Sequence, residues 1–85
     1  MAVKVFIKRR VKKGKTDTAL ELLKEVRSLA LKQPGYISGE TLVNHYDRCN
    51  ITVVSTWQSI DDWIRWQESD ERTGKADQLE GLAEG

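Results

Sequence analysis

The sequence is poor in residues that often carry chemistry or covalent cross-links. Its 85 residues include one cysteine, one histidine, one proline and one phenylalanine. A lone cysteine, Cys49, excludes a disulfide within the chain and favours a reducing, cytoplasmic location. No apolar run approaches the roughly 20 residues of a membrane span, so we expect a soluble protein without a membrane partner.

Motifs for the common chemistries are also missing. The chain shows no metal-ligand spacing, no glycine-rich phosphate loop and no nucleophile elbow. We therefore expect neither a metal nor a bound organic cofactor.

Basic residues gather near the N-terminus, although the formal net charge is only +1. The seven that precede Thr16 are Lys4, Lys8, Arg9, Arg10, Lys12, Lys13 and Lys15. Such asymmetry is typical of a nucleic-acid arm or of a solvated strand end followed by a turn, and we favour the second interpretation. RNA-recognition domains stack bases on aromatic residues of their central strands. The first strand offers only Phe6 for this, so we expect no nucleic-acid partner.

The first half of the chain predicts a strand and a helix. Val3, Val5 and Ile7 alternate and would share one face of a strand over 3–11. Apolar residues at helical spacing predict a helix over 17–32, and Thr18 with Glu21 has the form of a capping box. Pro34-Gly35 then ends the helix.

Two further strands follow, over 36–46 and 49–57, joined at Asp47-Arg48 as a hairpin. Both carry apolar residues on both faces. A single layer of helices hides only one face of a sheet, so the other face needs a cover as well. The simplest source is a second copy of the chain, which predicts a homodimer through the sheet face.

Ser59, with Asp62 three residues later, predicts the start of a second helix. Its apolar stripe would comprise Ile60, Trp63 and Ile64, with Trp66 at the shoulder, given about 100° per residue. The polar tail can add a short helix around 74–82 but shows no final strand, which would leave the first strand at a sheet edge. The pattern predicts one α+β domain over 1–85, ferredoxin-like β-α-β-β-α(-β) with an antiparallel sheet.

All three tryptophans lie within ten positions, at Trp57, Trp63 and Trp66. Each buried ring removes roughly 150–250 Å² from water, so leaving them exposed would forfeit much of a small domain's stability. We expect Trp57 and Trp63 to fill the core, whereas the shoulder position of Trp66 leaves open whether it packs in the core or walls a site for a flat ligand.

The chain resembles the antibiotic biosynthesis monooxygenase (ABM) superfamily of dimeric α+β barrel proteins. The segments that carry the resemblance are the basic turn with Gly14, "PGYISGETL", and "STWQSIDDWIRWQESD". It implies that two subunits pack sheet against sheet and that each keeps a pocket between its sheet and its helices. In the haem-degrading members, a tryptophan corresponds to Trp66, but their iron-ligating histidine and strand asparagine correspond to Ala76 and Ile7. Haem iron would lack its axial imidazole, so haem degradation is disfavoured.

Other members of the superfamily imply a cofactor-independent monooxygenase that acts on a small aromatic molecule, quinol or polyketide-like. The alternative is a non-catalytic dimeric ligand-binding or regulatory module of the same fold. His45, the only imidazole, is the natural candidate for a catalytic base by its pKa, although the face that it takes is open. The candidate substrate-binding residues are Trp66, Trp63, Ile7, Val5 and Asn44.

Overall fold

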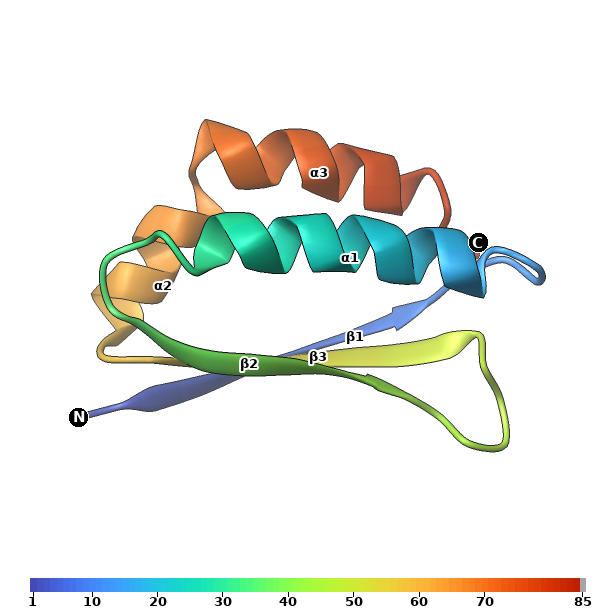
Figure 1. Ribbon diagram of the computed structural model, residues 1–85, viewed down its shortest axis with the longest axis horizontal. Helices are drawn as coiled ribbons and strands as arrows, with labels where there is room; N and C mark the ends of the chain where they lie inside the picture. The colour runs from blue at the N-terminus through green and yellow to red at the C-terminus, as the bar shows by residue number, and fades with distance from the viewer. Residues whose placement is uncertain (85) are drawn as a thin grey trace.

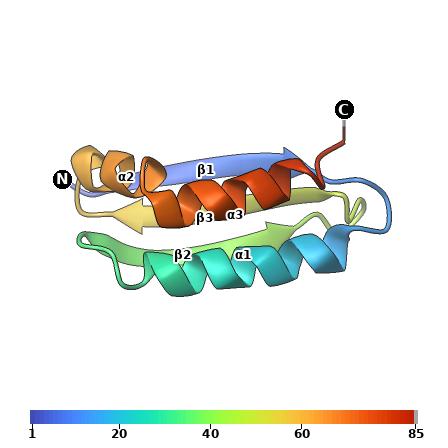
Figure 2. The same ribbon diagram turned by 90° about the horizontal axis from the view of Figure 1, so that it is seen from above.

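A computed structural model describes residues 1–84 and shows two layers, a sheet and three helices that cover one of its faces (Figure 1). In chain order the elements are β1 (Val3–Arg10), α1 (Thr16–Ala30), β2 (Tyr36–Val43), β3 (Asn50–Trp57), α2 (Ile60–Gln67) and α3 (Asp70–Glu80). From above, α1 and α3 run side by side over the sheet, with α1 above β2 (Figure 2). The expected α+β class is confirmed.

The sheet is antiparallel throughout, in the order β1-β3-β2. Val3, Val5 and Ile7 alternate with exposed neighbours along β1, as expected, and they pack against the tryptophans on the helix side. The same alternation continues to Arg9, which is half-buried. Arg9 is therefore not part of the solvated strand end that the basic run suggested, because its position in the pleat turns it toward the helices.

β1 lies at an edge of the sheet, as expected. A single antiparallel bridge pairs Val11, just after β1, with Ala83, just after α3. The chain after α3 thus returns to the end of β1, and within residues 1–84 it adds no fourth strand. No helix in this part of the chain has the length and apolar character needed to cross a bilayer.

The helix starts differ from expectation in one case and agree in the other. α1 begins at Thr16, and no side chain caps it, so the capping box proposed at Thr18 does not form. The Thr16 hydroxyl instead donates to the Arg48 carbonyl at 2.8 Å. This tertiary contact, rather than the capping motif at Thr18, sets the residue at which the helix begins. At α2 the expected cap is present, because Ser59 Oγ accepts from the backbone N–H of Asp62 at 3.2 Å.

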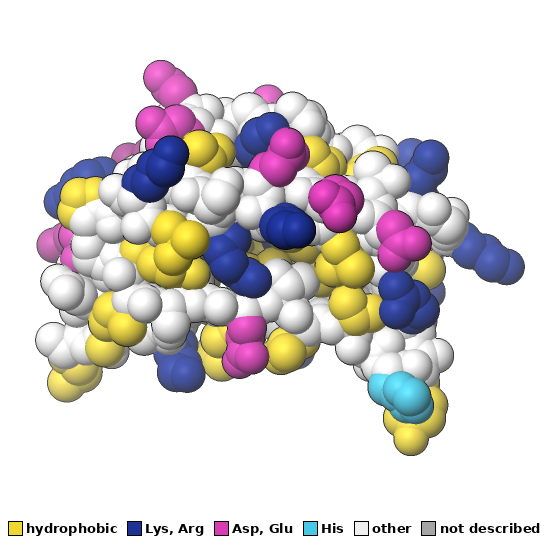
Figure 3. Space-filling view, in the orientation of Figure 1, with side chains coloured by type: hydrophobic (Ala, Val, Ile, Leu, Met, Phe, Trp, Pro, Cys, Tyr) yellow, Lys and Arg dark blue, Asp and Glu magenta, His cyan; other side chains and the backbone are white. Residues whose placement is uncertain are grey.

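The connection between β2 and β3 is longer than the expected two-residue turn. It covers residues 44–49, so both strands are shorter than the sequence suggested. Asn44 Oδ1 accepts from the backbone N–H groups of Tyr46 and Asp47 at 2.8 and 3.1 Å, which turns the chain out of the sheet. Figure 3 shows the single histidine, in cyan, on this projecting loop at the lower right.

Two groups of buried side chains fill the space between the layers. The first, called here the tryptophan cluster, comprises Ala30, Trp57, Trp63 and Trp66. The second, the distal cluster, comprises Val11, Ala19, Leu23, Ile51 and Leu79. Together they show that the core lies entirely on the helix side of the sheet, apart from Val54.

The buried face of α2 is not the one expected. Trp63 and Trp66 are buried, with 9% and 3% of their surfaces exposed, whereas Ile60 and Ile64 remain 50% and 40% exposed. Two indole rings remove more apolar area from water than two isoleucines do, so the helix turns its tryptophans inward. Trp66 therefore belongs to the core as well as to the cavity wall described below.

Candidate functional site: a tryptophan-walled cavity

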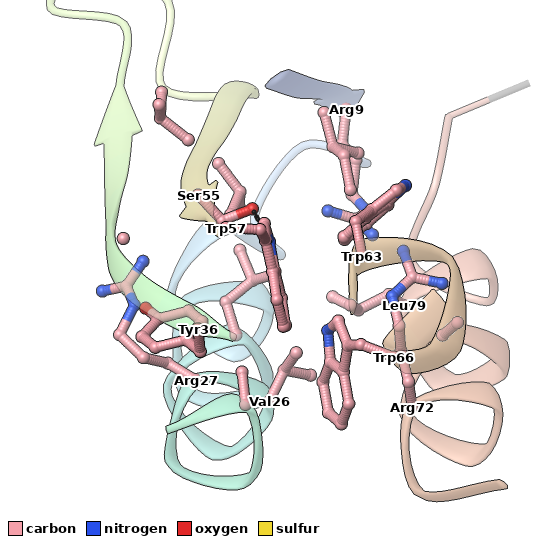
Figure 4. Close-up of a pocket in the computed structure, with 17 residues that line it drawn as sticks. Arg9, Val26, Arg27, Tyr36, Ser55, Trp57, Trp63, Trp66, Arg72 and Leu79 are labelled. Atoms are coloured by element: carbon pink, nitrogen blue, oxygen red, sulfur yellow. Dashed lines mark hydrogen bonds between the residues drawn. The ribbon is translucent and has the colours of Figure 1, made fainter. Parts of the chain in front are cut away.

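A cavity of about 50 Å³ lies between the sheet and the helices, with all three tryptophans in its lining (Figure 4). Its floor comes from β1 and β3, one wall from α1, and the opposite wall from α2 and α3. The apolar lining residues besides the tryptophans include Ile7, Leu23, Val26, Ala30, Val53, Val54, Ala76 and Leu79. This volume has room for only a few water-sized molecules, so a ring-sized ligand requires α1 and α3 side chains to move apart.

Trp57, at the end of β3, is the centre of the aromatic wall. Its ring lies 5.9 Å from that of Trp63 in an edge-to-face arrangement and 6.5 Å from that of Trp66 in a stacked one. Tyr36 packs edge-to-face against it at 5.2 Å. The Trp57 indole N–H donates to Ser55 Oγ at 3.0 Å, which satisfies the buried donor and fixes the plane of the ring.

Two arginines reach one side of the cavity. Arg9 comes from β1 and Arg72 from α3, where Arg72, Ala76 and Leu79 share one face of the helix. The Arg72 guanidinium lies over the Trp63 ring, 5.2 Å from its centroid, a cation–π contact. Figure 4 shows both guanidinium groups on the side where Trp63 lies.

Burial affects both arginines. It lowers the pKa of Arg9, the positive charge of Arg72 lowers that pKa further, and Glu80 partly offsets the effect. Burial likewise lowers the pKa of Arg72. An arginine nevertheless keeps its charge at neutral pH, so two partly desolvated cations stand near each other at this side.

The opposite side, toward β2, is already occupied by protein contacts. Arg27 donates to Thr41 Oγ1 at 2.7 Å, and Figure 4 shows it beside Tyr36. A Cβ at Gly39 would collide with the Tyr36 hydroxyl, so glycine at this position makes room for the tyrosine side chain.

The structure brings together three of the residues expected to form the site. Trp66, Trp63 and Ile7 all line the cavity, and so does Ala76, which the resemblance matched to the iron ligand of the haem-degrading members. Val5 packs against the tryptophan cluster from the helix side of β1 but does not reach the cavity.

His45 and Asn44 lie elsewhere. Both are exposed on the loop between β2 and β3, where the His45 ring packs edge-to-face on Tyr46 at 4.9 Å. Asn44 makes the loop hydrogen bonds described above. Neither lines the cavity of its own chain, and the catalytic role expected for His45 stays a prediction.

Sequence reasoning missed Arg9, Arg72 and Tyr36. The signal for Arg9 was present, because it continues the alternation of Val5 and Ile7 toward the core face. Arg72 lies in a polar segment without an apolar stripe, where nothing marks one arginine as inward-facing. Tyr36 follows Pro34-Gly35 directly, and its direction depends on an irregularity of the β2–β3 register between Tyr36 and Ser38.

The lining holds no set of side chains suited to bind an iron or zinc ion, since Tyr36 is its one residue of a kind that ligates iron. It contains no histidine, cysteine, aspartate or glutamate, and residues 1–84 hold no cluster of three or more such side chains. The groups that can act on a ligand here are aromatic faces, guanidinium groups, the Tyr36 and Ser55 hydroxyls and the backbone.

An antiparallel sheet with helices on one face and an aromatic cavity between the layers defines a small α+β domain of the ferredoxin-like type. Residues 2–74 match the antibiotic biosynthesis monooxygenase family. The chain belongs to this family. No curated protein matches it in sequence.

Solved structures agree with this fold. A conserved protein from Methanosarcina mazei Go1 superposes with a TM-score of 0.92 at 20% identity, over 100% of this chain and 84% of that one. SnoaB, a cofactor-independent oxygenase from Streptomyces nogalater, superposes with a TM-score of 0.86 at 17% identity, over 98% of this chain and 84% of SnoaB. At such identities the likeness shows a shared fold.

Proposed function

We propose that this protein is a small cofactor-independent monooxygenase that acts on an aromatic molecule, quinol or polyketide-like. The observation that carries the proposal is the convergence of Trp57, Trp63 and Trp66 on one cavity. Aromatic faces bind flat rings by stacking and edge contacts. Family membership and the likeness to SnoaB support oxygenase chemistry.

In such chemistry the deprotonated substrate is itself the source of electrons for dioxygen. The protein supplies a dry cavity, a wall that orients the ring and charges that favour the ionised substrate. These are the features that the cavity offers, since its lining is mainly apolar and its charged groups are cationic.

A second function is supported by one observation. The lining contains no histidine, lysine or carboxylate that could serve as a general base at neutral pH. This favours a non-catalytic module that binds the same class of ligand, for transport or regulation.

We also propose that the protein acts as a cytoplasmic homodimer. The sheet face away from the helices has no cover within residues 1–84 (Figure 1). It exposes 61% of Phe6, which pairs with Val54, and 47% of Leu42, which pairs with Thr52. A face of this kind favours association with a second copy. The single free cysteine fits a reducing compartment.

Oxygen uptake separates the enzyme from the binding module. The purified protein is given a panel of naphthoquinols, catechols and hydroxyanthracenes, and dioxygen consumption is measured alongside binding by calorimetry. The matched variant is Ala76→Leu, which fills the cavity without deleting a core side chain. Uptake that exceeds spontaneous oxidation and is lost in Ala76→Leu supports the enzyme, whereas binding without uptake supports the module. Neither binding nor uptake with any compound would overturn both.

A further inference from the structure

Arg9 and Arg72 lie at the cavity and form no ion pair with a carboxylate of residues 1–84. The ion pairs within residues 1–84 use other cations, namely Arg10, Arg48, Arg65 and Lys75. Glu80 is near enough to affect Arg9 through its charge but forms no ion pair with it. A buried charge normally has a partner, so two half-buried cations facing one cavity indicate a missing anion.

The two arginines come from different elements, and the backbone of each is held in place. The Arg9 backbone is fixed by the β1–β3 ladder, whose register pairs it with Ile51 of the distal cluster. The Arg72 backbone N–H donates to Ser69 Oγ at 3.3 Å at the start of α3, and its guanidinium lies over Trp63. Both side chains therefore start from fixed points at one cavity, which lowers the entropy lost on binding.

Like charges that are partly desolvated repel each other, and an anion between them converts the repulsion into two attractions. Carboxylate oxygens suit this place well, because the planar guanidinium fork donates two parallel hydrogen bonds to them. Arg27, on the opposite side, already donates to Thr41. The anion is accordingly expected at the Trp63 side of the cavity.

We propose that Arg9 and Arg72 form an anion subsite, and that the cavity selects an aromatic carboxylate whose ring lies against the tryptophans. The inference rests on the proposed function and deepens it by naming the substrate class. Neutral quinols would then be weaker ligands than aromatic acids of the same shape. The acid group would also orient the ring, because its place at the two arginines fixes which ring edge points toward Trp57.

The test compares two ligands that differ in charge and hardly in shape, 2-naphthoate and 2-naphthamide. Binding of each to the full-length protein is measured by calorimetry at neutral pH. Since a hydrogen bond to a charged group contributes more than a neutral one, we expect the acid to bind about tenfold or more tightly than the amide. The preference should fall to within about twofold in Arg9→Gln and in Arg72→Gln, with amide affinity little changed.

Two variants serve as controls, and a third stands in for Arg9→Gln where that variant does not fold. Arg27→Gln removes a cation from the other side of the cavity, and Lys24→Gln removes an exposed one from α1; both should keep the preference for the acid. If Arg9→Gln does not fold, Arg9→Met fills the same space with an apolar chain and replaces it in the comparison. Circular dichroism establishes folding for each variant.

The outcomes distinguish the subsite from the proposed function. Equal binding of acid and amide overturns the subsite and leaves the aromatic cavity standing. A preference lost only in Arg27→Gln overturns the assignment to Arg9 and Arg72. If neither naphthalene compound binds, the subsite is overturned, and the quinol panel decides the proposed function by itself.

Discussion

Arg9 stands on β1 where the alternation of Val3, Val5 and Ile7 leads one to expect an apolar side chain. A charged residue on the core face of a strand is rare unless a partner or a ligand compensates it. His45 shows the converse. It is the only imidazole and so attracts attention in the sequence, yet its ring lies in solvent on a loop. At the scale of single residues, the place of a residue in the fold therefore says more about whether it lines the cavity than its residue type does.

His45→Ala tests whether chemistry depends on the imidazole. Because the side chain is exposed and does not line the cavity, we expect ligand affinity to stay within about twofold of the unmodified protein, a change in free energy of under about 0.5 kcal/mol. Oxygen uptake should be lost if His45 is the catalytic base and should stay within the same twofold range if it is not. Calorimetry and an oxygen electrode measure the two quantities, with Ala76→Leu as the variant that should lose both. A loss of uptake with ligand affinity retained would establish His45 as the base.

At the scale of elements, similar capping motifs predict the starts of α1 and α2, but only the one at α2 forms. Ser59 Oγ accepts from the Asp62 N–H and donates to its carboxylate at 2.9 Å, whereas Thr18 is exposed within α1. Ser59→Ala should therefore lower the free energy of unfolding by about 1 kcal/mol. Thr18→Ala should leave it unchanged or raise it slightly, since alanine has the higher helix propensity. Urea denaturation of both variants checks the difference, and equal effects would contradict it.

Gly74 and Gly14 are a second pair of positions at which the same substitution should have opposite effects on stability. A Cβ added at either would meet no atom within 4 Å, but Gly74 lies inside α3 while Gly14 has a φ of +82°. Gly74→Ala should raise the free energy of unfolding by about 0.5–1 kcal/mol, because it removes backbone entropy from the unfolded chain. Gly14→Ala should lower it by about 1 kcal/mol or more, because alanine is strained in the left-handed region. Thermal melts decide the signs, and stabilisation by both variants would show that the turn relaxes.

The elements that sequence reasoning predicted well are those in which one local pattern dominates. The alternation on β1 and the apolar repeat of α1 each lead to one answer. Three features depend on tertiary contacts instead. The face of α2 is set by the area of its tryptophans, the start of α1 by the Thr16 contact with Arg48, and α3 by packing of Leu79 into the distal cluster. The cavity residues Trp63, Trp66 and Ile7 were predictable from family resemblance. Arg72 was not, since no local pattern marks it.

At the scale of the whole molecule, the helices cover one face of the sheet, and the opposite face is the one through which we propose that two copies associate. Phe6, 61% exposed on the outer face of β1, is the natural centre of a sheet-to-sheet dimer.

Phe6→Lys would add a third lysine beside Lys4 and Lys8 and should convert the dimer to a monomer, because like charges would face each other across the interface. Ile60→Lys, at a 50% exposed isoleucine on α2, provides a matched charge change away from that face and should leave the dimer intact. Sedimentation velocity over a range of concentrations measures both. A monomeric unmodified protein would contradict the dimer and leave the tryptophan cavity as a site complete within one chain. Dissociation by Ile60→Lys alone would place the association surface on the α2 side of the molecule.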